Sequence, residues 1–240
     1  MSDLLICTAN FAKGGNEDAL VRLKESCTFY GLGFEWYGDN STERNWMAWK
    51  VHKLIDFLEG ISHPYVLYTD GWDSWMLANE KIILDTYQSF EKPVVVGGHQ
   101  HLYPYSLWTH MGIKHDDFPE APTRFKFCCA GQFMGERESL IETLSILRDI
   151  YTEDVNDQGA WNTGIATRAI THIAEIDYEC KLFLTLSGIS HEQLQFDKEN
   201  RAVFQETGSR PIGVHFGGAK GGSSNSVNME SFYDRWWESR

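Results

Sequence analysis

Basic residues are scarce in this sequence. Its 240 residues include 21 Lys and Arg against 34 Asp and Glu, which gives a formal net charge of -13 at pH 7. Affinity for the phosphate backbone of nucleic acids comes chiefly from Lys and Arg. We therefore expect no stable nucleic-acid binding and no broad contact with an anionic membrane, although a local basic groove stays open. An acidic protein that holds an anionic nucleotide needs a divalent cation to do so.

Long apolar runs and paired cysteines are lacking as well. No stretch approaches the ~20 apolar residues of a membrane span, and residues 1–6 carry no basic region ahead of a long apolar segment. The five cysteines are odd in number, scattered and without CxxC spacing, so neither a disulfide framework nor a thiolate zinc site is indicated. These features predict a protein of the reducing cytoplasm without a membrane span.

Several catalytic signatures are missing from the sequence. No GxGxxG follows the first expected strand, and no GxxxxGK[ST] occurs anywhere. The motifs typical of dinucleotide oxidoreductases and of P-loop NTPases are therefore absent from the sequence. There is no GxSxG elbow, and the spacing of the nine histidines nominates no Ser or Cys nucleophile.

Apolar runs and amphipathic segments alternate along the first half of the chain. Strands are expected at 4–8, 34–37, 65–69 and 93–96, and helices at 17–30, 45–58 and 81–90. In the second half we expect strands at 125–129, 181–184 and 212–215, turns at Gly131 and Gly135, and helices at 136–150 and from 156 onward. A βαβ series of this kind favours a largely parallel sheet with right-handed crossovers.

The strand expected at 65–69 ends abruptly in two carboxylates, Asp70 and Asp73, with Trp72 between them. In open α/β sheets, ligands bind beyond the carboxyl ends of the strands. Carboxylate oxygens suit Mg²⁺ or Mn²⁺, ions that commonly complete their shells with substrate phosphates. A nucleotide diphosphate is the natural candidate. The alternative is structural, with Asp70 capping a turn and Asp73 capping a following helix.

A series of sequence blocks resembles the glycosyltransferase domain of the procollagen lysyl hydroxylases and related collagen-type sugar transferases. The blocks are, in chain order, 32–39 (LGFEWYGD), Lys50 and Val51, 67–73 (LYTDGWD), Tyr103 and Pro104, 129–135 (CAGQFMG), 156–158 (NDQ), 176–178 (IDY) with 182–183 (LF), 196–197 (FD), and 214–218 (VHFGG). Their order and spacing cover nearly the whole chain, which makes the match specific.

The resemblance implies an α/β fold of the GT-A (Rossmann-like) type, with a mostly parallel central sheet flanked by helices. It implies a single domain over 1–240, with the nucleotide and metal half at about 1–98 and the acceptor half at about 99–240. Asp70 and Asp73 then correspond to the metal-binding pair, and His215 to a third ligand. A histidine added to two carboxylates moves preference from Mg²⁺ towards Mn²⁺. From the residues alone, His215 reads as a core histidine at a strand end.

The resemblance also implies residues for the UDP-sugar. Trp72 falls where the family has an aromatic that stacks on uracil, although a tryptophan in the core is the alternative. Lys220 could neutralise the departing diphosphate or be a solvated loop lysine. The other expected donor-binding positions are Thr8, Ala9, Lys50, Tyr103 and Gly218.

Asn156 and Asp157 match a motif near the sugar and acceptor site of the family. Asp157 is the candidate contact for sugar or acceptor, and as a base it would have to reach the acceptor hydroxyl. Asn and Asp before a helix are also favoured N-caps. The sequence departs from the family at Cys129 and Ala130, at 97–99 (GGH) and at Tyr103, positions around the sugar and acceptor.

We therefore expect a metal-dependent glycosyltransferase that moves a hexose from UDP-glucose or UDP-galactose to an acceptor hydroxyl. The acceptor could be a saccharide, a hydroxylated protein side chain or a hydroxymethylated DNA base, in the cytoplasm of a bacterium or of a virus- or phage-infected cell. Two other readings stay open. One is a non-catalytic module that binds a nucleotide sugar or carbohydrate, and the other is a metal-dependent nucleotide-sugar phosphohydrolase, which in a two-metal form needs more clustered carboxylates.

Overall fold

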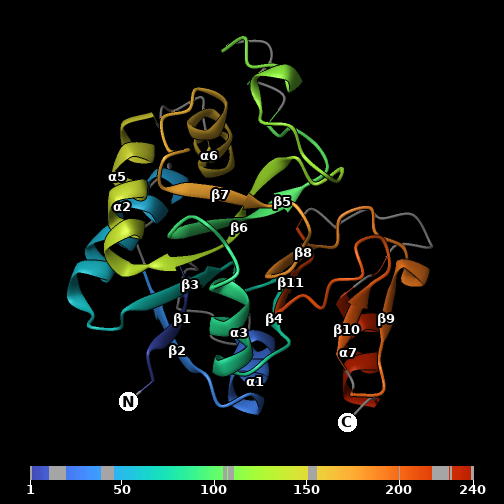
Figure 1. Ribbon diagram of the computed structural model, residues 1–240. Helices are drawn as coiled ribbons and strands as arrows, with labels where there is room; N and C mark the ends of the chain where they lie inside the picture. The colour runs from blue at the N-terminus through green and yellow to red at the C-terminus, as the bar shows by residue number, and fades with distance from the viewer. Residues whose placement is uncertain are drawn as a thin grey trace.

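The computed structural model (Figure 1) describes most of the chain. It covers residues 2–10, 20–38, 46–104, 107, 111–150, 156–199, 201–217, 227 and 229–238, with side chains from residue 50 onward in the helix that begins at 46. The expected residues Gly218 and Lys220 lie outside this part. None of the described helices combines the length and apolarity that are needed to cross a bilayer.

The core of the fold is one nine-stranded sheet with the strand order β2-β1-β3-β6-β5-β8-β11-β4 and β7 alongside β5. Its strands are β1 (Leu4–Ala9), β2 (Gly33–Tyr37), β3 (Tyr65–Thr69), β4 (Ser74–Met76), β5 (Val94–His99), β6 (Phe127–Glu136), β7 (Ala174–Asp177), β8 (Phe183–Thr185) and β11 (Gly213–His215). Parallel pairs dominate, and β6 and β4 run antiparallel to their neighbours. The predicted mostly parallel α/β sheet is confirmed.

Helices cover both faces of this sheet (Figure 1). They are α1 (Val21–Phe29), α2 (Trp46–Gly60), α3 (Glu80–Tyr87), α5 (Arg137–Ile150) and α6 (Asp157–Ala166). Successive side chains of a strand point to opposite faces of the sheet, so the apolar core is divided into two clusters, one on each face. In β3, Val66 and Tyr68 pack with α2, α5 and α6, whereas Leu67 packs with α1 and α3. The result is a three-layer arrangement with the sheet in the middle.

A smaller element sits beside the far end of the sheet (Figure 1). It contains the hairpin of β9 (Leu194–Phe196) and β10 (Ala202–Phe204), helix α7 (Met229–Glu238) and the short 3-10 turn His191–Gln193. A third apolar cluster joins it to β4 and β11 through Trp75, Val214 and Phe232. A further 3-10 turn, His115–Asp117, precedes β6.

Three features differ from expectation. Gly131 and Gly135 were expected as turns, but both lie inside β6, which continues to Glu136 because it pairs with β3 on one side and β5 on the other. Asp73 does not cap a helix, because the residues after it form β4. The strands β4, β7, β9 and β10 were not expected, since each has only three or four residues. In addition, β4 and β7 pair with strands that are distant in sequence.

Candidate functional site

Asp70, Asp73 and His215 meet at the carboxyl ends of β3 and β11. Asp70 follows the last residue of β3 and Asp73 precedes β4, which pairs antiparallel with β11 so that Ser74 faces His215. The N–H of Phe216 donates to the carbonyl oxygen of Asp73 at 2.8 Å, which fixes the loop against β11. The ligand atoms of the three side chains lie within 4.8 Å of one another, and His215 Nε2 is 3.3 Å from Asp73 Oδ1. These three side chains could hold a metal ion.

The imidazole of His215 is enclosed on several sides. A Cβ added at Gly131 or Gly217 would lie 2.4 Å or 2.5 Å from the ring, so glycine is required for the ring to occupy this position. Cys129 Sγ lies 3.4 Å from His215 Nδ1. With Nδ1 facing the thiol, Nε2 faces the carboxylates. A ring held in one orientation by its second nitrogen is the arrangement usual for a metal-binding histidine.

Electrostatics couple His215 to its neighbours. Burial lowers the pKa of His215, but Cys129 and Asp73 raise it by more, so the net pKa lies well above the usual range of histidine. Burial raises the pKa of Asp73, but the charge and hydrogen bond of His215 lower it, and the net shift is downward. Without a metal the two side chains therefore form an ion pair, and a bound cation would take the place of the proton.

Asp70 uses its two oxygens differently. Oδ1 accepts hydrogen bonds from Lys50 Nζ at 2.8 Å and from the Tyr68 hydroxyl at 2.7 Å. Oδ2 faces His215 Nε2 at 3.7 Å. The two donors leave Oδ2 as the oxygen that points into the cluster with His215 and Asp73.

Lys50 joins the carboxylates of β3 to the acceptor-side motif. Its Nζ lies 2.7 Å from Asp157 Oδ2 and 2.8 Å from Asp70 Oδ1, and the residue is only 6% exposed. Burial lowers the pKa of Lys50, but Asp157 and Asp70 raise it by more, so the net shift is upward. The ammonium is thus a fixed buried charge that holds two carboxylates from opposite halves of the chain.

Asn156 and Asp157 lie at the start of α6. The Asn156 side chain accepts the Gly159 N–H at 2.8 Å, so the predicted N-cap is confirmed. Asp157 Oδ1 accepts the Gln158 N–H at 2.9 Å, and Oδ2 accepts from Lys50. Both residues therefore carry structural hydrogen bonds at a position close to Asp70.

The expected nucleotide residues lie around the end of β1 and the Asp70 loop. Trp72 is 56% exposed, so the alternative of a core tryptophan is wrong. Thr8 is fully buried against this loop, since a Cβ added at Gly71 would lie 2.8 Å from Thr8 Oγ1. Ala9 ends β1, and Tyr103 is half exposed on a separate loop, with its carbonyl oxygen accepting from Asn162.

Sequence reasoning missed one residue beside the cluster, Tyr68, and the role of another, Lys50. Tyr68 was treated only as part of an apolar strand, although its hydroxyl binds Asp70. The role of Lys50 as a bridge between Asp70 and Asp157 was also missed, because its partners lie 20 and 107 residues away. A tyrosine two residues before a strand-ending aspartate is the one local signal that was present.

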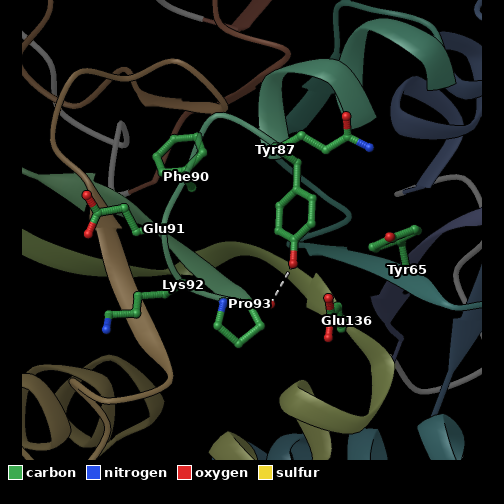
Figure 2. A pocket seen from close by; sticks show the side chains of 8 residues that line it. Tyr65, Tyr87, Phe90, Glu91, Lys92, Pro93 and Glu136 are labelled. Atoms are coloured by element: carbon green, nitrogen blue, oxygen red, sulfur yellow. Dashed lines mark hydrogen bonds between the residues drawn. The ribbon is translucent and has the colours of Figure 1, made fainter.

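A hollow of about 350 Å³ lies elsewhere on the molecule (Figure 2). Its lining includes Tyr65, Tyr87, Pro93 and Glu136, and the Tyr87 hydroxyl donates to the Pro93 carbonyl oxygen at 2.7 Å. Tyr65 begins β3 whereas Asp70 follows its end, so the hollow and the cluster lie at opposite edges of the sheet. The hollow is therefore separate from the Asp-Asp-His cluster.

The chain is similar to a viral protein in sequence and to a glycosyltransferase in fold. A protein of Acanthamoeba polyphaga mimivirus, described as uncharacterized, is 23% identical over 210 residues, which are 84% of this chain and 43% of that protein. The chain therefore spans less than half the length of this relative. A crystal structure of a glycosyltransferase involved in the glycosylation of the major capsid of PBCV-1 has a similar fold, with a TM-score of 0.53, 13% identity and 98% of each chain covered.

The family comparison covers nearly the whole chain. The model of the PLOD GT domain matches residues 6–239, a span that includes every residue of the Asp-Asp-His cluster and of the Lys50 bridge. With the α/β sheet and the cluster at its carboxyl edge, this match identifies the chain as a member of the PLOD glycosyltransferase-domain family.

Proposed function

We propose that this protein transfers a hexose from a UDP-sugar, UDP-glucose or UDP-galactose, to an acceptor hydroxyl in a reaction that requires a divalent cation. The observation that carries the proposal is the cluster of Asp70, Asp73 and His215 at the carboxyl edge of the sheet. Two carboxylates and one imidazole suit Mn²⁺, with Mg²⁺ as the second choice. When bound, the cation would stabilise the negative charge that grows on the UDP leaving group.

The protein's own contribution is to hold these ligands in place before substrate arrives. Lys50 and Tyr68 occupy Asp70 Oδ1, so that Oδ2 is the oxygen available for coordination. Gly131 and Gly217 leave room for the His215 ring, whose Nδ1 faces Cys129. Because these ligands are already in position, they need no rearrangement when negative charge develops on the leaving group during transfer.

The nucleotide and acceptor would lie on either side of this cluster. In this proposal Trp72 stacks on uracil, the backbone of Thr8 and Ala9 meets the nucleoside, and Gly218 and Lys220 contact the diphosphate. Tyr103, Asn156 and Asp157 face the sugar and acceptor. We place the nucleotide and metal half of a single domain at about residues 1–98 and the acceptor half at about 99–240, with His215 reaching from the second half to the carboxylates of the first.

The proposal is tested by UDP release from a panel of UDP-sugars, with and without Mn²⁺, in the wild type and in Asp73→Ala. Release that needs the metal, prefers one hexose and is lost in the variant would support it. The acceptor is then sought among saccharides, hydroxylated peptides and hydroxymethylated DNA.

Two results of the same panel would overturn the proposal. Binding of UDP-sugars without any release of UDP, across the whole acceptor panel, would identify a non-catalytic binding module. Formation of a sugar phosphate in place of UDP would identify a phosphohydrolase.

A further inference from the structure

Four residues of neighbouring strands lie in one row at the edge of the sheet that holds the cluster: His99, Thr185 and His215 end their strands, and Ser74 begins the antiparallel β4. His215 pairs with Ser74 of β4 on one side and with Thr185 of β8 on the other. Gly98 of β5 pairs with Leu184, so the next residue along, His99, lies beside Thr185. Side chains at one register position point to the same face of a sheet. Thr185 and His99 therefore continue, on the same face, the row that contains the candidate metal ligand His215.

The Thr185 hydroxyl is buried without a partner among the described residues. The residue is 3% exposed, and its Oγ1 makes no hydrogen bond to any part of the chain that the structure describes. A buried hydroxyl without a hydrogen bond is unfavourable relative to one that is hydrogen-bonded to water. Buried polar groups are normally hydrogen-bonded, and a bound ligand that accepts or donates this hydrogen bond would explain why the hydroxyl of Thr185 is left without one. Its position beside His215 places that ligand next to the candidate metal site.

His99 offers a second neutral group to the same ligand. Its Nδ1 lies 2.8 Å from the carbonyl oxygen and 3.1 Å from the backbone nitrogen of His101, which fixes the ring against its own loop. This leaves Nε2 as the ring atom available to a ligand. Burial lowers the pKa of His99, and the neighbouring His101 and His215 lower it further, whereas the His101 backbone raises it. The ring is therefore neutral at pH 7.

We propose that Thr185 and His99 bind the hydroxyl groups of the transferred sugar, and that this sugar is an uncharged hexose. A hydroxyl and a neutral imidazole can each donate or accept, as sugar hydroxyls require. The inference rests on the proposed function, because it places the sugar beside a diphosphate held at His215. Neither residue contributes a charge that would pair with a sugar carboxylate, and the other member of the row, Ser74, is also neutral.

The test compares binding of UDP with binding of UDP-glucose and UDP-galactose, by calorimetry in the presence of Mn²⁺. The variants are Thr185→Val and His99→Ala, with Thr185→Ser and His99→Gln as conservative forms that keep a hydrogen-bonding group. Thr143→Val is the matched control, because Thr143 on α5 is likewise buried with an unpartnered hydroxyl but lies outside the row.

We expect Thr185→Val and His99→Ala each to weaken binding of the preferred UDP-hexose by about three- to tenfold, the value of one net hydrogen bond. Binding of UDP should stay within about twofold of the wild type, a margin smaller than the value of one such bond. Thr185→Ser and His99→Gln should recover most of the loss, and Thr143→Val should change neither ligand. Thermal unfolding of Thr185→Val without ligand should occur at or above the wild-type temperature, since an unsatisfied buried group has been removed.

Two outcomes would overturn the inference while leaving the proposed function intact. One is metal-dependent UDP binding in the wild type with equal or no losses for UDP and UDP-hexose in Thr185→Val and His99→Ala. The other is wild-type protein that binds UDP but neither UDP-hexose. Failure of the proposed function is distinguished from both, because the wild type would then show no metal-dependent binding of UDP at all.

Discussion

The two edges of the central sheet hold polar groups in different ways. At the carboxyl edge, the ammonium of Lys50 is buried between Asp70 and Asp157, and His215 is buried beside Asp73. At the amino edge, the carboxylates that line the hollow of Figure 2, Glu91 and Glu136, are exposed on the surface. Burying an unpaired charge destabilises the folded state, whereas an exposed charge has little effect on its free energy. Paired, buried charge therefore distinguishes the carboxyl edge, which holds the candidate site, from the amino edge.

The largest difference between the edges is expected for metal-dependent turnover. Asp73→Asn removes a ligand charge at the carboxyl edge and should lower UDP release by at least about a hundredfold, beyond the usual effect of losing an outer-shell partner. Glu136→Gln makes the same change of chemistry at the amino edge and should leave turnover unchanged. Steady-state kinetics with saturating Mn²⁺ measure both, and circular dichroism checks folding. An equal loss of UDP release in Asp73→Asn and Glu136→Gln would contradict the placement of the active site at the carboxyl edge.

The second prediction concerns the free energy of unfolding. Lys50→Met leaves Asp70 and Asp157 without their shared cation and should lower it by about 3 kcal/mol, as expected when one member of a buried pair is removed. Lys81→Met, in the exposed pair with Asp85, should change it by less than about 0.5 kcal/mol. Urea unfolding monitored by tryptophan fluorescence gives both values.

A double variant checks the cause of the Lys50 effect. Combining Lys50→Met with Asp157→Asn removes one of the stranded charges, so part of the lost stability should return. If the double variant is less stable than the sum of the two single changes, the bridge is not the source of the stability.

A smaller effect is expected from the space around His215. Gly131→Ala places a methyl group where the ring lies, with 2.4 Å between Cβ and Cε1, and should weaken Mn²⁺ binding about tenfold by displacing the ligand. Gly60→Ala is the matched control, because a Cβ there meets nothing within 4 Å. Calorimetric titration with Mn²⁺ compares them. Unchanged affinity in Gly131→Ala would show that the ring position does not matter for the metal.

The smallest expected effect is on the pH dependence. The pKa of His215 is raised, so its contribution to stability is complete below about pH 6.5 and is lost as the pH rises through the folded-state value. The pKa of Asp73 is lowered, so its contribution is present above about pH 4 and is lost in stronger acid. Metal-free protein should therefore lose stability from neutral to alkaline pH.

Metal affinity should follow the opposite trend. His215 must give up its proton to coordinate a cation, so Mn²⁺ should bind more tightly as the pH rises over the same range. His215→Gln should flatten both profiles. Urea unfolding with a chelator and calorimetry with Mn²⁺ at several pH values provide the two curves, and parallel trends would contradict the assignment of His215.

The predictability of this fold follows the range of the interactions. The strands β1, β3 and β5 were predicted because their apolar runs are local signals. The three-residue β4 was not, since its pairing with β11 joins residues more than 130 positions apart. Gly131 and Gly135 indicated turns, but the structure uses their small size within β6, where added Cβ atoms would meet His215 and the Pro93 carbonyl.

The candidate site was only partly predictable, for the same reason. Asp70 and Asp73 stand out locally at a strand end, and His215 was indicated only by the resemblance to a family. No local pattern could join Lys50 to Asp157, or align Thr185 with His99, because each pair is formed by the packing of distant segments. Sequence reasoning therefore found the candidate ligands, and also Lys50 and Asp157, but not the contacts that join them.

The most direct test of the central claim is a crystal structure of the protein grown with Mn²⁺ and UDP, with anomalous scattering used to locate the metal. The account predicts an anomalous peak bounded by Asp70 Oδ2, Asp73 Oδ1 and His215 Nε2, with the diphosphate of UDP against it and Trp72 on the base. A peak at the amino-edge hollow, or UDP bound there without metal, would contradict it.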